Sequence, residues 1–193
     1  MNRQRVAFAG IASLALAVVA SPAKADLFDF LRPFAPTVGA DGRPLAVAPP
    51  RETVAYQGHY APGTVVISTQ ERRLYYVLPN GQAVRYGVGV GRPGFSWSGV
   101  KTVSMKREWP DWTPPSQMLR RRPDLPRHMA GGIGNPLGAR AMYLGGTLYR
   151  IHGSNEPETI GTAVSSGCIR MTNDDVSDLY SRVSVGTKVV VQR

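Results

Sequence analysis

The strongest constraint on the fold of this chain is a hairpin signal. Residues 73–78 are rich in aromatic and branched side chains, the turn formers Asn80 and Gly81 follow, and residues 83–90 resume the same pattern. An Asn-Gly pair between two such runs favours a tight turn between antiparallel strands. The sequence therefore predicts a sheet in this region.

Further strand-like runs extend the sheet along the chain. They are rich in branched and aromatic side chains and lie at residues 64–69, 101–106, 141–144, 147–152 and 188–192. Gly145-Gly146 separates two of these runs and favours a second hairpin. The expected fold is therefore mainly β.

Near the C-terminus the apolar spacing changes to that of a helix. The apolar side chains that repeat at i, i+3, i+4 and i+7 are Val176, Leu179, Tyr180 and Val183. This period is typical of an amphipathic helix. Thr172 or Asn173 can cap it, and Asp175 completes a Thr-x-x-Asp capping box. One short helix is therefore expected.

The first 25 residues have the features of an export signal. Arg3 and Arg5 precede an uncharged run, residues 6–20, and residues 23–25 offer the small side chains that a signal peptidase reads. The run is shorter than the roughly 18 apolar residues that mark a membrane-spanning helix. We expect cleavage after Ala25 and a mature periplasmic protein that has no membrane span.

Removal of the signal leaves enough chain for one domain and a tail. Residues 26–62 hold five prolines before Pro62, which predicts an extended Pro/Gly-rich segment and places the domain at residues 63–193. The formal charge falls from +10 to +7 when Arg3, Arg5 and Lys24 are lost. This charge favours anionic partners. For an exported protein these are peptidoglycan carboxylates, anionic lipids or acidic wall polymers.

The stretch between Lys106 and Ala141 fits neither the strand period nor the helix period. A loop this long in a compact domain is usually functional or a lid. Trp109 and Trp112 either line a substrate groove or pack the loop, and packing is the favoured interpretation. The basic run at residues 120–122 is interpreted as a solvated or wall-facing surface, so nucleic acid is rejected as a partner.

Cys168 is the only cysteine of the chain. Exported proteins usually pair their cysteines, so an unpaired thiol needs a reason, and the simplest alternative is a small buried apolar residue. His152 ends a strand-like run sixteen positions earlier. An imidazole can activate a thiol as a nucleophile near neutral pH. The pair therefore indicates acyl transfer, with Cys168 as nucleophile and His152 as base.

The neighbours of this pair can complete an acyl-transfer site. Gly167 allows a tight turn, and the amides of Ser166, Gly167 and Cys168 can face a developing oxyanion. The Gly153 carbonyl can accept the second imidazole N–H and fix the tautomer of His152.

Ser165 and Ser166 are expected to be loop and oxyanion-hole residues, since no Ser-x-x-Lys or Gly-x-Ser-x-Gly pattern surrounds them. Arg170 either binds a substrate carboxylate or forms a structural salt bridge.

With these residues in view, the sequence resembles the L,D-transpeptidase catalytic domain family, also called the YkuD family. The resemblance rests on His152-Gly153 and on the segment 165–171 with Asn173, and it extends over residues 63–193, including segments 106–115 and 132–138. It implies a β-sandwich-like domain with one short helix after the cysteine. Many members carry a second histidine where this chain has Ser166.

The resemblance also implies a reaction. The family's nucleophile and base align with Cys168 and His152. Its cysteine forms a thioester with a peptidoglycan stem tetrapeptide. The acceptor is left open: a stem-peptide amine gives a 3-3 cross-link, the amine of an outer-membrane protein or lipoprotein attaches it to the wall, and water gives an L,D-carboxypeptidase. The alternative of another class is a non-catalytic wall-binding protein.

No metal or cofactor is predicted. His59 and His128 are isolated in the sequence, which gives no ligand-like spacing for zinc. Thioester exchange needs only a thiol, a base and oriented amides.

Overall fold

The computed structural model describes residues 37–38, 44–45 and 48–193. The predicted signal peptide and most of the segment 26–47 lie outside the described residues, so both stay predictions. Within the described part of the chain, no helix is both long enough and apolar enough to cross a membrane.

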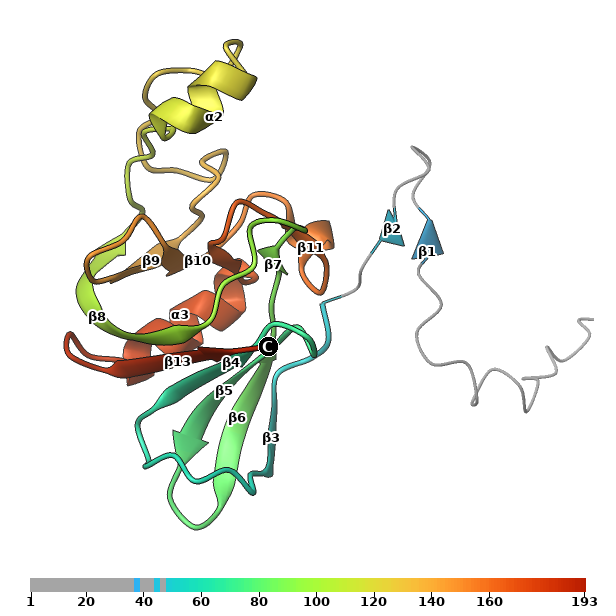
Figure 1. Ribbon diagram of the computed structural model, residues 1–193, viewed down its shortest axis with the longest axis vertical. Coiled ribbons are helices and arrows are strands. Elements are labelled where there is room, and N and C mark those ends of the chain that lie inside the picture. The colour runs from blue at the N-terminus through green and yellow to red at the C-terminus, as the bar shows by residue number, and fades with distance from the viewer. Residues whose placement is uncertain (1–36, 39–43, 46–47) are drawn as a thin grey trace, which may run out of the picture. The chain divides into compact units, whose positions relative to one another are not determined.

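One continuous sheet of nine strands dominates the described domain. In spatial order its strands are β12 (Ile169–Arg170), β10 (Arg150–His152), β9 (Arg140–Leu144), β8 (Gly99–Glu108), β13 (Lys188–Gln192), β4 (Val65–Ser68), β5 (Arg73–Leu78), β6 (Gln82–Gly87) and β3 (Glu52–Ala55). Figure 1 shows the sheet curling, with β8 as a long curved strand between the two halves. The register of β8 with β9 shifts between Val103 and Met105, and such an irregularity bends a strand.

Short elements complete the part of the chain that the structure describes. They are β1 (Thr37–Val38) paired with β2 (Pro44–Leu45), β7 (Val90–Gly91) paired with β11 (Ala163–Ser165), the helices α2 (Ser116–Arg121) and α3 (Asn173–Arg182), and the 3-10 turn η1 (Pro157–Thr159). β11 runs parallel to β7. This pairing matters for the site because β11 leads directly into the segment that carries Cys168.

The predicted hairpin and helix are both confirmed. β5 pairs with β6 across the turn, where Asn80 (φ 60°) and Gly81 (φ 67°) adopt the left-handed backbone that these residue types tolerate. α3 is capped by Thr172, whose Oγ1 accepts a hydrogen bond from the Asp175 amide at 3.1 Å. The local signals in the sequence were therefore sufficient for these two elements.

The core lies between the curled sheet and α3. Its largest fully buried side chains include Ile67, Leu74, Tyr86, Met142, Leu144, Ile151, Met171 and Leu179. Val176 and Leu179 of α3, and Val183 directly after it, pack against this core. The helix directly after Cys168 is therefore fixed by packing, which also fixes the segment in front of it.

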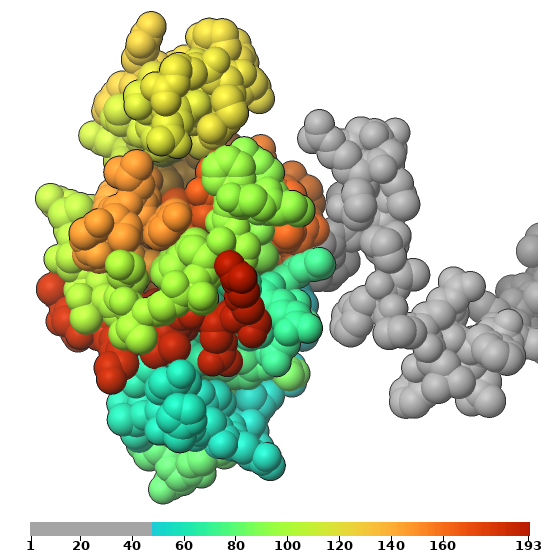
Figure 2. Space-filling view, in the orientation of Figure 1, coloured from blue at the N-terminus to red at the C-terminus, as the bar shows by residue number. Residues whose placement is uncertain are grey.

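Two elements extend beyond the expected pattern. β3 lies in the segment 26–62 and pairs with β6 at the edge of the sheet. α2 lies in the long loop between β8 and β9, residues 109–139, which we call the 109–139 loop. α2 has six residues, none of them buried, and no side-chain cap, so it left no periodic signal in the sequence. Figure 2 shows the region of α2 standing out as a lobe at one end of the domain.

Candidate active site

Strand pairing brings Cys168 and His152 together. β12 runs parallel to β10, with Ile169 opposite Ile151 and Arg170 opposite His152. Cys168 directly precedes β12, so it lies beside the strand that ends in His152. Residues sixteen positions apart thus become neighbours through one two-residue strand.

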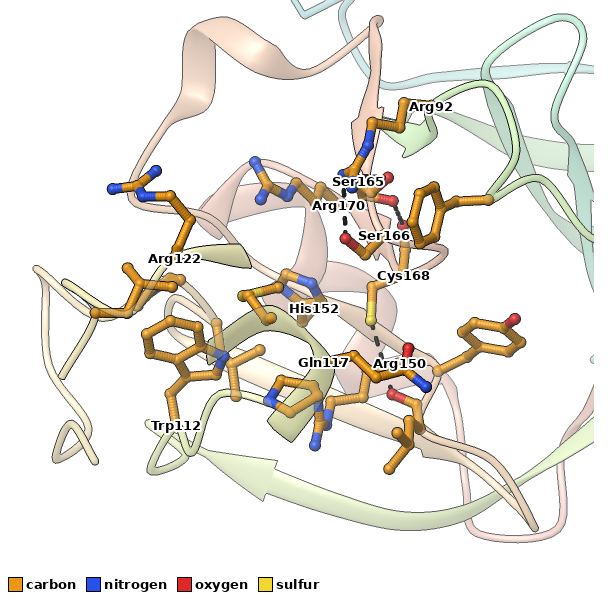
Figure 3. Close-up of a pocket in the computed structure, with 18 of the residues that line it drawn as sticks. Arg92, Trp112, Gln117, Arg122, Arg150, His152, Ser165, Ser166, Cys168 and Arg170 are labelled. Carbon is orange, nitrogen blue, oxygen red and sulfur yellow. Dashed lines mark hydrogen bonds between the residues drawn. The ribbon is translucent and has the colours of Figure 1, made fainter. Parts of the chain in front are cut away.

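Both side chains line a cleft of about 660 Å³. Figure 3 shows the Cys168 sulfur and the His152 ring projecting into this space. The 109–139 loop supplies one wall, with Trp112, Gln117 and Met118 among its lining residues. The long loop without periodicity therefore covers the only thiol of the chain.

Hydrogen bonds between its own residues hold the shape of the 109–139 loop. The buried Asn135 donates from Nδ2 to the carbonyls of Pro110 (3.1 Å) and Ala130 (3.0 Å). The backbones of Trp112 and Met129 exchange two hydrogen bonds of 2.8 Å. Trp112 is buried and also lines the cleft, whereas Trp109 is 45% exposed. Both of the roles considered for the tryptophans therefore apply to Trp112.

His152 is oriented by the next peptide group. Its ring is 4% exposed, and its Nδ1 lies 2.6 Å from the Gly153 carbonyl oxygen. A carbonyl oxygen only accepts hydrogen bonds, so Nδ1 carries the proton and Nε2 has a free lone pair.

Burial, together with the positive charges of Arg170 and Arg150, lowers the pKa of His152 to about 3. The hydrogen bond to Gly153 has the opposite, smaller effect. The imidazole is therefore neutral near pH 7.

Gly153 is glycine for a steric reason. A Cβ at this position would overlap the Oδ1 atom of Asn173 and come within 3.1 Å of the Ala139 amide. That Oδ1 accepts a hydrogen bond from the same Ala139 amide at 2.9 Å. The start of α3 and the end of the 109–139 loop thus meet at the peptide that orients His152.

Cys168 is a half-buried thiol at the floor of the cleft. Its Sγ donates to the Leu148 carbonyl at 3.8 Å. Burial raises the pKa of the thiol, and the hydrogen bonds from the Arg150 amide and side chain and the positive charges of Arg150 and Arg170 only partly oppose this effect. The resting site is therefore a neutral thiol beside a neutral imidazole.

The segment before the thiol is held by Ser165. This side chain is 2% exposed, and its Oγ donates to the Cys168 carbonyl at 2.6 Å while it accepts from the Gly167 amide at 3.1 Å. The Gly167 amide was expected to face an oxyanion, and in this structure it is bonded to the Ser165 hydroxyl, so its role stays a prediction. Of the three amides considered, those of Ser166 and Cys168 are the stronger candidates.

Gly167 is fixed by an aromatic pair that the sequence analysis missed. Its φ is +108°, and a Cβ would overlap the Tyr149 ring. Tyr149 stacks on Trp97 with centroids 4.6 Å apart, and the Trp97 Nε1 donates to the Gly167 carbonyl at 2.7 Å. The turn that presents Cys168 therefore requires glycine.

Ser166 faces the cleft and is held by Arg92. The Arg92 guanidinium donates to the Ser166 Oγ at 3.1 Å, and the Arg92 amide donates to the Ser165 carbonyl at 3.0 Å. Since its oxygen accepts from Arg92, the Ser166 hydroxyl keeps its own hydrogen for another partner. Arg92 was not among the residues singled out in the sequence.

Arg170 forms the salt bridge that was one of its two expected roles. Its guanidinium lies 3.0 Å from the Glu156 carboxylate, and both residues line the cleft. Binding of a substrate carboxylate by Arg170 stays a prediction.

Arg150 is another cleft-lining arginine that sequence reasoning missed. It lies two positions before His152 on β10, so the two side chains lie on the same side of the sheet. That two-residue spacing was the signal available in the sequence. Figure 3 labels Arg150 beside Cys168.

The other two histidines lie apart from this site. His59 is exposed, and His128 pairs with Asp111 at 3.5 Å. Among the described residues, no group of three or more histidine, cysteine or acidic side chains could hold a metal ion.

Comparison with known proteins decides the family. The model of the L,D-transpeptidase catalytic domain, YkuD, matches residues 62–191. The chain belongs to this family. The resemblance inferred from the sequence is therefore confirmed, whereas the roles of individual residues stay predictions.

Relatives agree with this L,D-transpeptidase assignment. The probable L,D-transpeptidase ErfK/SrfK of Escherichia coli is 40% identical over 136 residues, which make up 66% of this chain and 43% of that protein. The chain thus spans less than half of that relative. A solved L,D-transpeptidase from Mycobacterium smegmatis is 20% identical, with a TM-score of 0.55 over 67% of this chain and 58% of that chain. This likeness confirms the strand-rich fold with its curled sheet and short helix.

A third similar protein carries a different name. A crystal structure from Brucella melitensis described as a probable carnitine operon oxidoreductase is 48% identical, with a TM-score of 0.50 over 74% of this chain and 93% of that chain. Its name and the family model disagree. We follow the family model because it matches residues 62–191, a span that includes both Cys168 and His152.

Proposed function

We propose that this protein is a peptidoglycan L,D-transpeptidase that forms a thioester at Cys168 with a stem tetrapeptide and transfers the acyl group to an amine. The observation that carries the proposal is the pairing of a half-buried thiol with a buried imidazole whose Nδ1 is occupied by the Gly153 carbonyl. This arrangement leaves Nε2 of His152 as the base that faces the cleft.

The neutral resting pair determines how acylation proceeds. The Cys168 sulfur attacks the carbonyl of the stem's third residue while its proton moves to Nε2 of His152, because neither the thiolate nor the imidazolium is favoured at rest. The tetrahedral intermediate then collapses. The C–N bond breaks, the imidazolium gives its proton to the leaving amine, and the terminal D-amino acid departs.

Charge on the substrate oxygen needs donors in the cleft. The amides of Ser166 and Cys168 and the Ser166 hydroxyl are the groups we assign to this role, since Ser165 already engages the Gly167 amide. Oriented donors of this kind stabilise an oxyanion without reorganisation during the reaction. The arginine held against Ser166 fixes the direction of that hydroxyl.

The second half of the reaction reverses the proton transfers. An amine acceptor loses a proton to Nε2 of His152 as it attacks the thioester, the C–S bond breaks, and the sulfur takes the proton back. We propose a stem-peptide amine or the amine of an outer-membrane protein or lipoprotein as acceptor. Either would be met in the periplasm, where the predicted export signal would deliver the protein.

Product analysis tests the proposal and its alternatives. The protein from Asp26 onward is incubated with a tetrapeptide stem, with and without an added amine, beside the Cys168→Ala variant. We expect an amide between stem and amine from the parent alone. Release of the terminal amino acid without any amide would indicate an L,D-carboxypeptidase. Retention of peptidoglycan with no turnover by the folded parent would favour a non-catalytic wall-binding protein.

A further inference from the structure

Arg150 lines the cleft, and its side chain acts on the Cys168 thiol. Within the described part of the chain, its Nε is buried and has no hydrogen-bond partner. A buried donor without a partner destabilises the fold, and more so if it is charged. A ligand that enters the cleft can complete the bonding of such a group.

Three of the other arginines of the cleft are engaged by neighbouring side chains, and the fourth, Arg121, lies over the Phe95 ring at 5.5 Å from its centre. Arg170 pairs with Glu156 at 3.0 Å, Arg122 pairs with Asp124, and Arg92 donates to Ser166. Arg150, like Arg121, forms no ion pair with a described carboxylate, but it lies beside Cys168, and its guanidinium carbon lies 5.1 Å from the centre of the Tyr143 ring. An aromatic face steadies a cation but leaves the planar edge of the guanidinium available for an anion.

The position of Arg150 relates it to the scissile bond. Its amide, its charge and its side-chain donor all act on the Cys168 thiol, and the same segment supplies the Leu148 carbonyl to that sulfur. A carboxylate that reaches Arg150 while its carbonyl carbon contacts the sulfur must lie close to that carbonyl, since neighbouring residues are about 3.8 Å apart. In a tetrapeptide donor, the carboxylate of the leaving residue meets this condition.

We infer that Arg150 is a specificity-determining residue, which binds the carboxylate of the leaving amino acid of the donor. The inference rests on the proposed function. The guanidinium forms two parallel N–H···O bonds with this carboxylate, and a donor that presents an uncharged amide there lacks the ionic part of the interaction. Arg150 thereby selects donors that end one residue after the attacked carbonyl.

The test compares two donors that differ only in this group. One is a tetrapeptide stem with a free terminal carboxylate, and the other is the same peptide with a terminal carboxamide. The rate of thioester formation is measured by mass spectrometry of quenched samples. We expect the parent to prefer the free acid by about 10- to 100-fold, the range of a charged hydrogen bond.

Variants assign this preference to the side chain. In Arg150→Gln the preference should disappear because the rate with the acid falls to that with the amide. Arg150→Lys should retain part of the preference, since a lysine keeps the positive charge but cannot form two parallel N–H···O bonds. Arg120→Gln is the charge-matched control: Arg120 is exposed and does not line the cleft, so its loss should leave the preference unchanged.

Each contrary outcome has a distinct meaning. If Arg150→Gln lowers the rate of thioester formation equally for both donors, or for neither, Arg150 does not bind the carboxylate and the inference is overturned. A merely structural role would lower both rates and leave their ratio unchanged, which separates it from recognition. If the folded parent acylates with neither donor, the proposed function itself fails, and the role of Arg150 falls with it.

Discussion

Removal of the Ser165 hydroxyl should loosen the turn that presents the nucleophile. Ser165→Ala deletes the donor to the Cys168 carbonyl (2.6 Å) and the acceptor for the buried Gly167 amide (3.1 Å). Each buried polar group left without a partner costs about 1–3 kcal/mol. Since the carbonyl is only partly buried, we expect the free energy of unfolding to fall by roughly 2–4 kcal/mol in total.

Urea unfolding followed by tryptophan fluorescence measures this loss. Ser154→Ala is the matched control because Ser154 is equally buried, at 2% exposed, but its Oγ accepts a single hydrogen bond, from the Glu156 amide at 2.9 Å. This variant should lose about half as much. If Ser165→Ala loses no more stability than Ser154→Ala, the two hydrogen bonds do not hold the turn and our reasoning about Gly167 is refuted.

Three further predictions follow from the same site. Burial lowers the pKa of His152 to about 3, whereas the ordinary pKa of histidine is about 6.5. Between these two pH values the unfolded chain binds a proton at His152 and the folded chain does not. Stability should thus be lost as pH falls, by roughly 2 kcal/mol at pH 5, and a urea titration of His152→Gln that shows the full parental loss would contradict this. Because burial raises the pKa of Cys168, its alkylation by iodoacetamide should have a higher midpoint pH than in the urea-unfolded chain, whereas a lower midpoint would indicate a thiolate–imidazolium pair. Gly153→Ala should cost about 1–3 kcal/mol in urea unfolding through overlap with the Asn173 side chain, while Gly134→Ala, where a Cβ meets open space, should be neutral, and equal effects would refute the packing argument.

Local signals explain what the sequence could predict of the fold. The β5–β6 turn and the start of α3 are set by residues within a few positions of each other, so Asn80-Gly81 and Thr172 were readable directly. The parallel pairing of β12 with β10 has no such signal, because it joins two short strands through tertiary packing. β3 was likewise hidden within a segment whose prolines indicate an extended tail.

The candidate site shows the same division. Cys168 and His152 could be chosen from their chemistry alone, because an unpaired exported thiol and a nearby imidazole have few common roles. The use of the Gly167 amide could not be foreseen, since only the folded turn shows that the Ser165 hydroxyl reaches it. Arg150 was readable in principle from its two-residue spacing to His152, but an arginine at a strand position has many uses.

The assignment of Cys168 as the acylated nucleophile is tested most directly by intact-mass spectrometry. Protein from Asp26 onward, as parent, Cys168→Ala and Cys168→Ser, is quenched in acid after incubation with a tetrapeptide stem. We expect the parent to gain the mass of the stem without its terminal amino acid and Cys168→Ala to gain nothing. The same adduct on folded Cys168→Ala, or no adduct on the folded parent while the stem is consumed, would contradict this assignment.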